Sequence, residues 1–306
     1  SESIEIEGNF FSTENFGLSL KVVNGSLGKL GISTEKFDLK GVLDLNLDIQ
    51  RSPSDNKLAF NGSIEKFNIN DQDMGTLRFF TSGNTQLNSY ELSVLLSNQE
   101  QNALIVNGSI LGFDESPKLN LDFKFDDFDL SFLEPLGGEG IDNIRGRVSG
   151  NVNLWGPLNA PKHMGTLILN GGGLRIINVN TDYSIADATE VTLEKQIFKF
   201  NNTAFSDTQF GTQGAIKGEI NHLNFRDWGF DLFIDSDRIL MLNRPEREEE
   251  IFFGDGFFGG NVHLYGPSKN LTIDLIGATE EGTSIKIPWA DDYGLADTSF
   301  INFINK

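Results

Sequence analysis

The sequence lacks cysteine, which excludes disulfides and thiolate chemistry. Tryptophan and tyrosine are scarce, with 3 and 4 residues, whereas phenylalanine occurs 26 times. Basic residues are few as well: 24 lysines and arginines stand against 44 acidic residues, and the net charge is −20. A protein with this charge repels phosphate backbones, so we expect no nucleic-acid partner.

Long hydrophobic runs and helical periodicity are also missing. No apolar run is long enough for a membrane-spanning helix, and no helical pattern persists. Apolar and polar residues alternate instead, as in "KLNLDFKFDD", which places Leu119, Leu121, Phe123 and Phe125 on one face of a strand. Turn-forming pairs such as Asn-Gly and Gly-Pro separate these segments, so the sequence predicts an all-β chain. Further strands are predicted at 41–50, 91–96, 151–155, 165–169, 197–201, 230–235, 261–265 and 271–276, with short helical or irregular corners at 129–136 and 236–243.

The chain also repeats itself. The octapeptide "GNVNLWGP" (150–157) returns as "GNVHLYGP" (260–267), and each copy reads as one strand that ends at a Gly-Pro pair. The surrounding segments follow the same order, with a period of about 105 to 110 residues. Repeats of this kind stack on their neighbours and share one apolar face. We expect one continuous β-trough over residues 1–306, built from units at about 1–105, 106–212 and 213–306.

A sheet with one apolar face must cover that face. A second sheet does so in a closed sandwich, whereas an array of similar one-sided strands can curl into an open trough. The sequence permits both, and its many Leu and Phe residues favour a floor that holds lipid. For each residue of that face, the alternative to lipid contact is ordinary packing in a protein core. The candidate lipid-groove residues are Leu119, Leu121, Phe123, Phe125, Val152, Leu154, Leu167, Leu169, Phe198, Phe200, Leu232, Ile234, Val262 and Leu264.

Motifs for catalysis and metal binding have little support. The histidines His163, His222 and His263 have no metal-ligand spacing and are expected to be exposed strand or loop residues. The Gly-x-Gly-x-x-Gly match at 254–259 precedes a strand rather than a helix, so we expect a hairpin turn there and no nucleotide site. Acidic clusters such as 126–129 are expected to be solvated. We therefore expect no catalytic residue, no metal, no cofactor and no enzymatic activity.

Three segments resemble the TamB family, the inner-membrane-anchored subunits of the translocation and assembly module in the AsmA-like group. Residues 252–306 pass from a Gly-rich segment to "GNVHLYGP", "NLTID", "GTSIKIP" and "FINF", in the order of the family pattern. Residues 146–174 resemble its other recurrent phrase, a strand, a Pro-bearing loop and "GTLIL". Residues 183–220 follow the family order, whereas residues 1 to about 105 match only in style.

The resemblance implies a long protein of Gram-negative bacteria that is anchored in the inner membrane and extends across the periplasm. It implies a U-shaped β-taco with an apolar floor that shields phospholipid acyl chains between the two membranes and supports outer-membrane biogenesis. This chain would be an internal or C-terminal-half part, because no anchor helix precedes Ser1 and no partner-docking region follows Lys306. Contact with TamA, the BamA-like barrel partner of the family, would then involve regions outside these residues.

Two alternative functions stay open. One is a scaffold or chaperone that assists outer-membrane barrel assembly by β-augmentation, which would require a long unpaired edge strand. The other is a surface β-solenoid for adhesion or carbohydrate binding. The scarcity of Trp and Tyr argues against that alternative.

Overall fold

A computed structural model describes residues 2–53, 56–83, 88–98, 101–112, 117–246 and 252–287. These residues form strands and three short 3-10 helices. The elements are β1 (Ser3–Ser12), β2 (Asn15–Ser26), η1 (Leu27–Leu30), β3 (Leu39–Arg51), β4 (Asn56–Ile69), β5 (Gln72–Gly83), β6 (Ser89–Asn98), β7 (Gln101–Leu111), β8 (Lys118–Asp129), η2 (Ser131–Leu136), β9 (Ile141–Pro157), β10 (Lys162–Ile176), η3 (Ile177–Val179), β11 (Thr181–Ile185), β12 (Thr189–Lys195), β13 (Ile197–Asp207), β14 (Gln213–His222), β15 (Trp228–Arg244), β16 (Phe253–Pro267), β17 (Thr272–Thr279) and β18 (Ser284–Lys286).

All strands belong to one 18-stranded antiparallel sheet. From β1 to β10 each strand pairs with the next one in the chain. The long strand β10 then pairs with β12 along its first part and with β11 along its last part, and both of these pair with β13. The meander resumes from β13 to β17, and β18 pairs with β16. The predicted all-β class is confirmed.

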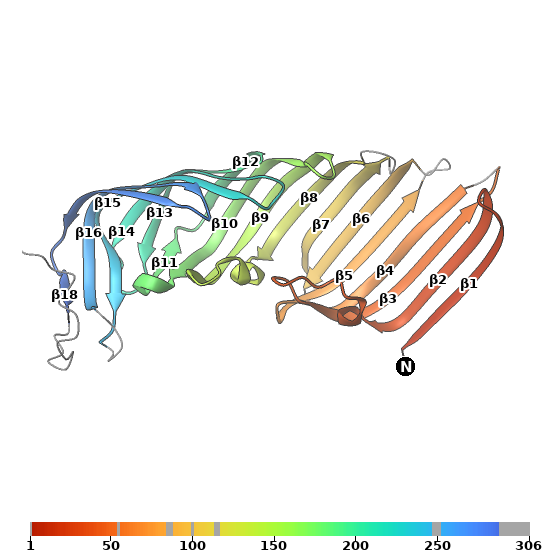
Figure 1. Cartoon of the computed structure of the whole chain (residues 1–306), viewed down its shortest axis with the longest axis horizontal. Coiled ribbons are helices and arrows are strands. Elements are labelled where there is room, and N and C mark those ends of the chain that lie inside the picture. Colours follow the sequence, from red (N-terminus) through yellow and green to blue (C-terminus); the bar gives the residue numbers. More distant parts are fainter. Residues whose placement is uncertain are drawn as a thin grey trace, which may run out of the picture.

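The sheet forms an elongated trough. Figure 1 shows the strands side by side across the long axis, from β1 at the N-terminal end to β16 and β18 at the other. In the C-terminal half the sheet arches, and β15 follows the upper border of the view before it turns down. Strand twist and the bulges in many of the pairings account for this curvature, because each bulge bends the strand that carries it.

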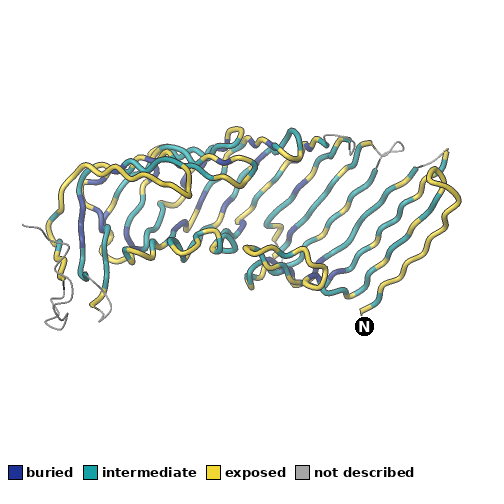
Figure 2. Tube along the Cα trace, in the orientation of Figure 1, coloured by how far each residue is buried: buried dark blue, intermediate teal, exposed yellow. Residues whose placement is uncertain are grey.

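Buried residues are spread along this sheet rather than gathered in one centre (Figure 2). Among the described residues they form four clusters. The largest lies along the edge of the trough that carries η1 and η2, where Leu27 of η1 is 3% exposed and Phe132 of η2 packs against the cluster. The 3-10 helices thus cap one rim of the trough and leave the rest of its apolar face without a second layer of strands among the described residues.

The strands predicted from alternation are all confirmed, and the corner predicted at 129–136 contains η2. The corner predicted at 236–243 is wrong, because β15 continues through it. A bulge between Ser236 and Ile239 absorbs the irregular pattern. The strand stays paired with β16 up to Arg244, whereas its pairing with β14 ends at Arg238. The hairpin turn predicted at 254–259 is also wrong, since these glycines lie inside β16, where they allow close approach of the neighbouring backbone.

The two octapeptides occupy equivalent places, as the repeat predicts. They end β9 at Pro157 and β16 at Pro267, and in each case the proline carbonyl accepts a hydrogen bond from the amide three residues later, at 2.9 Å and 2.8 Å. The glycine before each proline has nearly the same left-handed backbone, with φ of 106° at Gly156 and 102° at Gly266. One turn design is therefore used twice.

Candidate functional site: the apolar floor of the trough

A continuous apolar row crosses the sheet from β3 to β17. In an antiparallel pair, directly opposed residues point to the same face, so the pairing register identifies which side chains share the floor. Each member of the row is the direct partner of the next, and every member is apolar or glycine. In order they are Leu43, Ile64, Leu77, Leu96, Leu104, Phe125, Gly150, Leu167, Val191, Phe200, Gly218, Leu232, Leu264 and Ile273.

The structure places all candidate groove residues on the face that carries this row. Phe125, Leu167, Phe200, Leu232 and Leu264 belong to the row itself. The others lie on the same strands and on the same face, an even number of residues away from the row member of their strand. They are Leu119, Leu121, Phe123, Val152, Leu154, Leu169, Phe198, Ile234 and Val262.

These side chains pack against one another without forming a closed interior. Leu121 and Val152 are each 8% exposed and belong to neighbouring clusters. Phe123, Leu154 and Phe198 are only half-buried and pack at the borders of those clusters. The floor thus combines tightly packed aliphatic groups with accessible rings and chains.

The opposite face of the same strands is polar. The side chain of Asn153 donates to Asp122 on the neighbouring strand at 2.9 Å, and Lys199 forms a 2.7 Å ion pair with Glu194. Because one face carries these groups and the other carries the apolar row, the sheet presents two surfaces of opposite character. Of the two, the inner surface is the one with a continuous apolar row.

Glycines shape the floor at the points where strands approach closely. Gly150 has φ of 148°, and a Cβ built there would lie 2.2 Å from the carbonyl oxygen of Thr166. At Gly62 a Cβ would lie 2.9 Å from Cζ of Phe79, its direct partner, so the ring fills the space above the glycine. At Gly62, on the same face as the row, an aromatic ring therefore covers the place where a side chain is missing.

Two of the three histidines contradict the prediction that they are exposed. His163 is 1% exposed and His222 is 4% exposed, and their Nε2 atoms lie 2.8 Å apart. The sequence signal was available, because His163 shares the parity of Leu167 on β10, and His222 shares that of Ile220 on β14. Pairing between the intervening strands then brings the two rings together on the inner face. The 59 residues that separate the two histidines in the sequence give no indication of this proximity.

The histidine pair lies in an aromatic cluster near one end of β10, β13 and β14. The rings of Phe198 and Trp228 lie 4.9 Å and 5.1 Å from His163 and His222, respectively. Phe225 stacks on His222 at 4.3 Å. Burial lowers the pKa of both histidines, that of His163 to about 4, and the nearby charge of His222 adds to the effect on His163. Both rings are therefore neutral at pH 7.

The third histidine is half-buried on the polar face. His263 forms a 2.7 Å contact with Asp231, and its ring is stacked between Phe233 and Tyr265 at 4.0 Å and 4.5 Å. Within the described part of the chain, no group of three or more His, Cys, Asp or Glu side chains is arranged to hold a metal ion. The helices found there are also too short and too polar to span a membrane.

Comparisons with protein-family models, with curated proteins and with solved structures found no match to this chain.

Proposed function

We propose that this protein holds phospholipid acyl chains on its apolar floor and lets them move along the trough. The observation that carries the proposal is the unbroken row from Leu43 to Ile273, which meets no polar side chain while it crosses from β3 to β17. The resemblance to TamB proteins supports the setting: a segment of a periplasmic bridge between the inner and outer membranes of a Gram-negative bacterium.

The energetics suit transport better than storage. Each buried CH₂ group of an acyl chain contributes about 0.8 kcal/mol, so a chain gains affinity from length of contact rather than from one strong bond. The row offers similar accessible contacts on several strands, such as the half-buried Leu104, Phe125 and Leu167. A chain that advances by one strand exchanges equivalent contacts, and the barrier between neighbouring positions stays low.

A second candidate is supported by the edge strand. Among the described strands β1 pairs with β2 alone, so one side of its ten residues has unpaired backbone groups. Ile6 and Phe11 on this strand are 68% and 75% exposed. Such an edge can accept another strand, as a scaffold for barrel assembly would require.

The first test measures binding of a fluorescent fatty acid to matched variants of β9. Leu154→Asp places a carboxylate on the floor, whereas Asn151→Asp adds the same charge to the polar face of the same strand. We expect Leu154→Asp to weaken binding by about tenfold, because the chain loses contacts with the floor and approaches a charge. Asn151→Asp should bind like the native chain.

The outcomes separate the two candidates. Equal binding by the native chain and by Leu154→Asp, with both variants folded by circular dichroism, would refute the lipid proposal. If fatty acid does not bind but a peptide with a barrel-strand sequence binds the native chain and Leu154→Asp equally, the scaffold function is favoured.

A further inference from the structure

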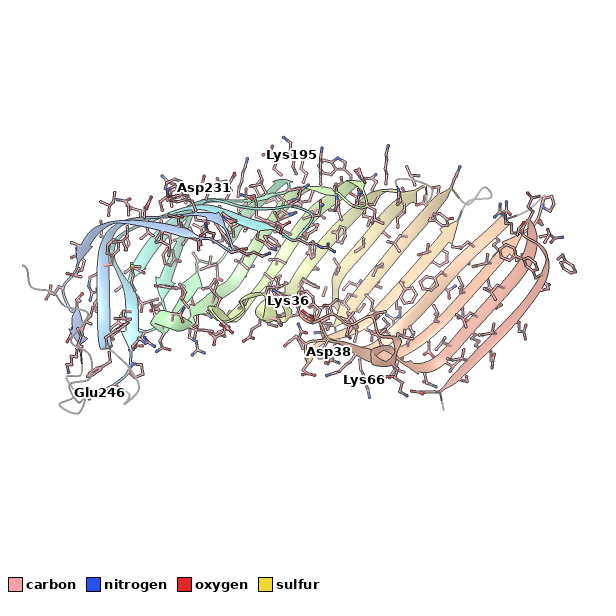
Figure 3. The ribbon with its side chains drawn as sticks, in the orientation of Figure 1. Lys36, Asp38, Lys66, Lys195, Asp231 and Glu246 are labelled. Atoms are coloured by element: carbon pink, nitrogen blue, oxygen red, sulfur yellow. The ribbon has the colours of Figure 1, made fainter. Side chains whose placement is uncertain are left out.

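A cavity of about 1040 Å³ lies where the two rims of the trough approach each other. One side is formed by residues 34–37, which precede β3, together with Leu136 of η2. The other side is formed by residues 225–230 at the β14–β15 turn and by residues 266–269 at the β16–β17 turn. Figure 3 shows Lys36 on the loop near η2, at the rim opposite the strand ends marked by Lys195. Ligand pockets usually have about 300–1000 Å³, so the space suits a lipid head group with its first methylene groups.

The cavity is continuous with the apolar floor. Trp228 and Phe230 line it, and they alternate along β15 on the same face as Leu232, a member of the apolar row. Phe230 pairs directly with Ile220, and the ring of Trp228 lies 6.1 Å from that of Phe198, a groove candidate. An acyl chain on the floor could therefore extend into the cavity without crossing a polar barrier.

Three cations surround this apolar wall. Lys36, Arg226 and Lys269 line the cavity, and none of their side chains forms a hydrogen bond or an ion pair with another residue of the described ranges. Most arginines of the sheet are engaged, as in the 2.6 Å pair of Arg145 with Asp182. In a chain of net charge −20, three unengaged cations around one cavity are available for an anionic ligand.

The nearby acids reduce this positive charge without cancelling it. Glu35 and Asp227 also line the cavity, so the charged lining residues are three cations and two anions. A second cavity, of about 670 Å³, has the opposite character, because its lining includes four aspartates and Arg147. An anionic head group would thus favour the cavity at the rims.

The turn that presents Arg226 is held in a strained conformation. Asn224 and Phe225 have φ of 56° and 57°, a left-handed backbone that is costly for a bulky residue such as Phe225. The amide of Phe225 donates to Nδ1 of His222 at 3.0 Å, and the amide of Asn224 donates to Oε1 of Gln196 at 3.1 Å. These bonds fix the turn so that Phe225, 45% exposed, and Arg226 both line the cavity.

From this geometry we infer that the cavity is a head-group site for phosphate-bearing diacyl lipids. The phosphate would lie among Lys36, Arg226 and Lys269, while the acyl chains leave past Trp228 and Phe230 onto the floor. The inference rests on the proposed function and deepens it, because it adds a charge preference to a floor that selects only for apolar character. Lysine and arginine side chains donate to phosphate in charge-assisted hydrogen bonds.

The test compares three probes by isothermal titration with the whole chain: dioctanoyl phosphatidylglycerol, dioctanoylglycerol and inorganic phosphate. The first two have the same acyl chains and differ in the phosphate head group. We expect the phosphatidylglycerol to bind about tenfold more tightly than the dioctanoylglycerol. The triple variant Lys36→Gln, Arg226→Gln and Lys269→Gln should lose this preference and bind dioctanoylglycerol as the native chain does.

A second triple variant controls for loss of positive charge in general. Lys66→Gln, Lys118→Gln and Lys195→Gln remove three exposed cations that do not line the cavity, and they should leave binding of both lipids unchanged. If the cavity variant keeps the preference, or the control variant loses it, the head-group inference is wrong.

The remaining outcomes distinguish this inference from the proposed function. Equal binding of both lipids by the native chain would overturn the head-group site and leave the acyl-binding floor intact. Absence of binding by either lipid would overturn both. If inorganic phosphate alone binds as tightly as the phosphatidylglycerol and loses binding in the cavity variant, the site serves free phosphate rather than lipid.

Discussion

The buried histidine pair makes the stability of the protein depend on pH in a way that one substitution can isolate. The hydrogen bonds assign the tautomers. Nδ1 of His222 accepts from the amide of Phe225, so Nε2 of His222 carries the proton and donates to Nε2 of His163. His163 then carries its own proton on Nδ1, which has no partner among the described residues. A further proton on either ring would break one of these two bonds.

The sign and size of the effect follow from the pKa of His163. In the unfolded chain this pKa has its ordinary value near 6.5, and in the folded chain it falls to about 4. Both states are neutral above pH 6.5, and below it the unfolded state binds a proton that the folded state excludes. The free energy of unfolding therefore decreases by about 1.4 kcal/mol per pH unit as the pH falls from 6.5 to 4, or about 3 kcal/mol over the window. His222, whose pKa is also lowered by burial, acts in the same direction.

The assay is urea unfolding at pH 8, 6.5, 5.5 and 4.5 with the native chain and His163→Phe. At pH 8 the variant should be less stable by about 1–3 kcal/mol, because Nε2–H of His222 loses its buried acceptor. As the pH falls below 6.5, the variant lacks the penalty of His163, so the difference should shrink by about 1.4 kcal/mol per pH unit. Carboxylates titrate in both proteins and cancel in the comparison.

His263→Phe provides the control, because the side chain of His263 is 32% exposed on the polar face and contacts neither buried histidine. The difference between this variant and the native chain should not shrink in the same manner. A constant difference between native and His163→Phe from pH 8 to 4.5 would refute the reasoning. So would an equal pH response in both variants.

Two further predictions concern the frame of the trough. Gly150→Ala should lower the free energy of unfolding by about 2 kcal/mol or more, because its Cβ would lie 2.2 Å from the carbonyl oxygen of Thr166; Gly140→Ala, where no atom lies within 4 Å, should change it by less than about 0.5 kcal/mol in the same urea assay. Arg145→Lys should cost about 1–2 kcal/mol, since lysine cannot reproduce the two-pronged contact with Asp182 at 2.6 Å and 3.1 Å, and a native-like urea midpoint would contradict this.

Much of the fold was predictable because its signal is local. Alternation along one strand fixes which residues share a face, so Phe123 and Phe125 could be assigned to the floor without knowledge of their neighbours. The Gly-Pro ends of the octapeptides likewise marked the ends of β9 and β16. The prediction at 254–259 was wrong because glycine occurs both in turns and at close strand pairings. The choice between them depends on pairing with β15 on one side and with β17 and β18 on the other.

The less predictable features depend on distance across the sheet. His163 and His222 are 59 residues apart, and they meet only because the strands between them pair in succession. The cavity at the rims joins residues 34–37 with 225–230, and this requires the curvature of the whole trough, which accumulates from many small twists and bulges. No local pattern encodes that sum, so neither the cations nor the aromatic wall could be assigned to one site from the sequence.

The locally patterned floor and the cavity formed by distant segments have different roles in the proposed function. A floor that is to conduct acyl chains must be similar at every strand, and a residue pattern of period two repeated along the chain produces that similarity. Selection of a head group requires a single place that differs from the rest. The place that we propose lies where loops from distant strands converge on Lys36, Arg226 and Lys269. If the head group is held at this rim while the chains lie on a uniform floor, the cations set which lipids enter the trough, and their removal should change lipid choice without weakening the hold on acyl chains.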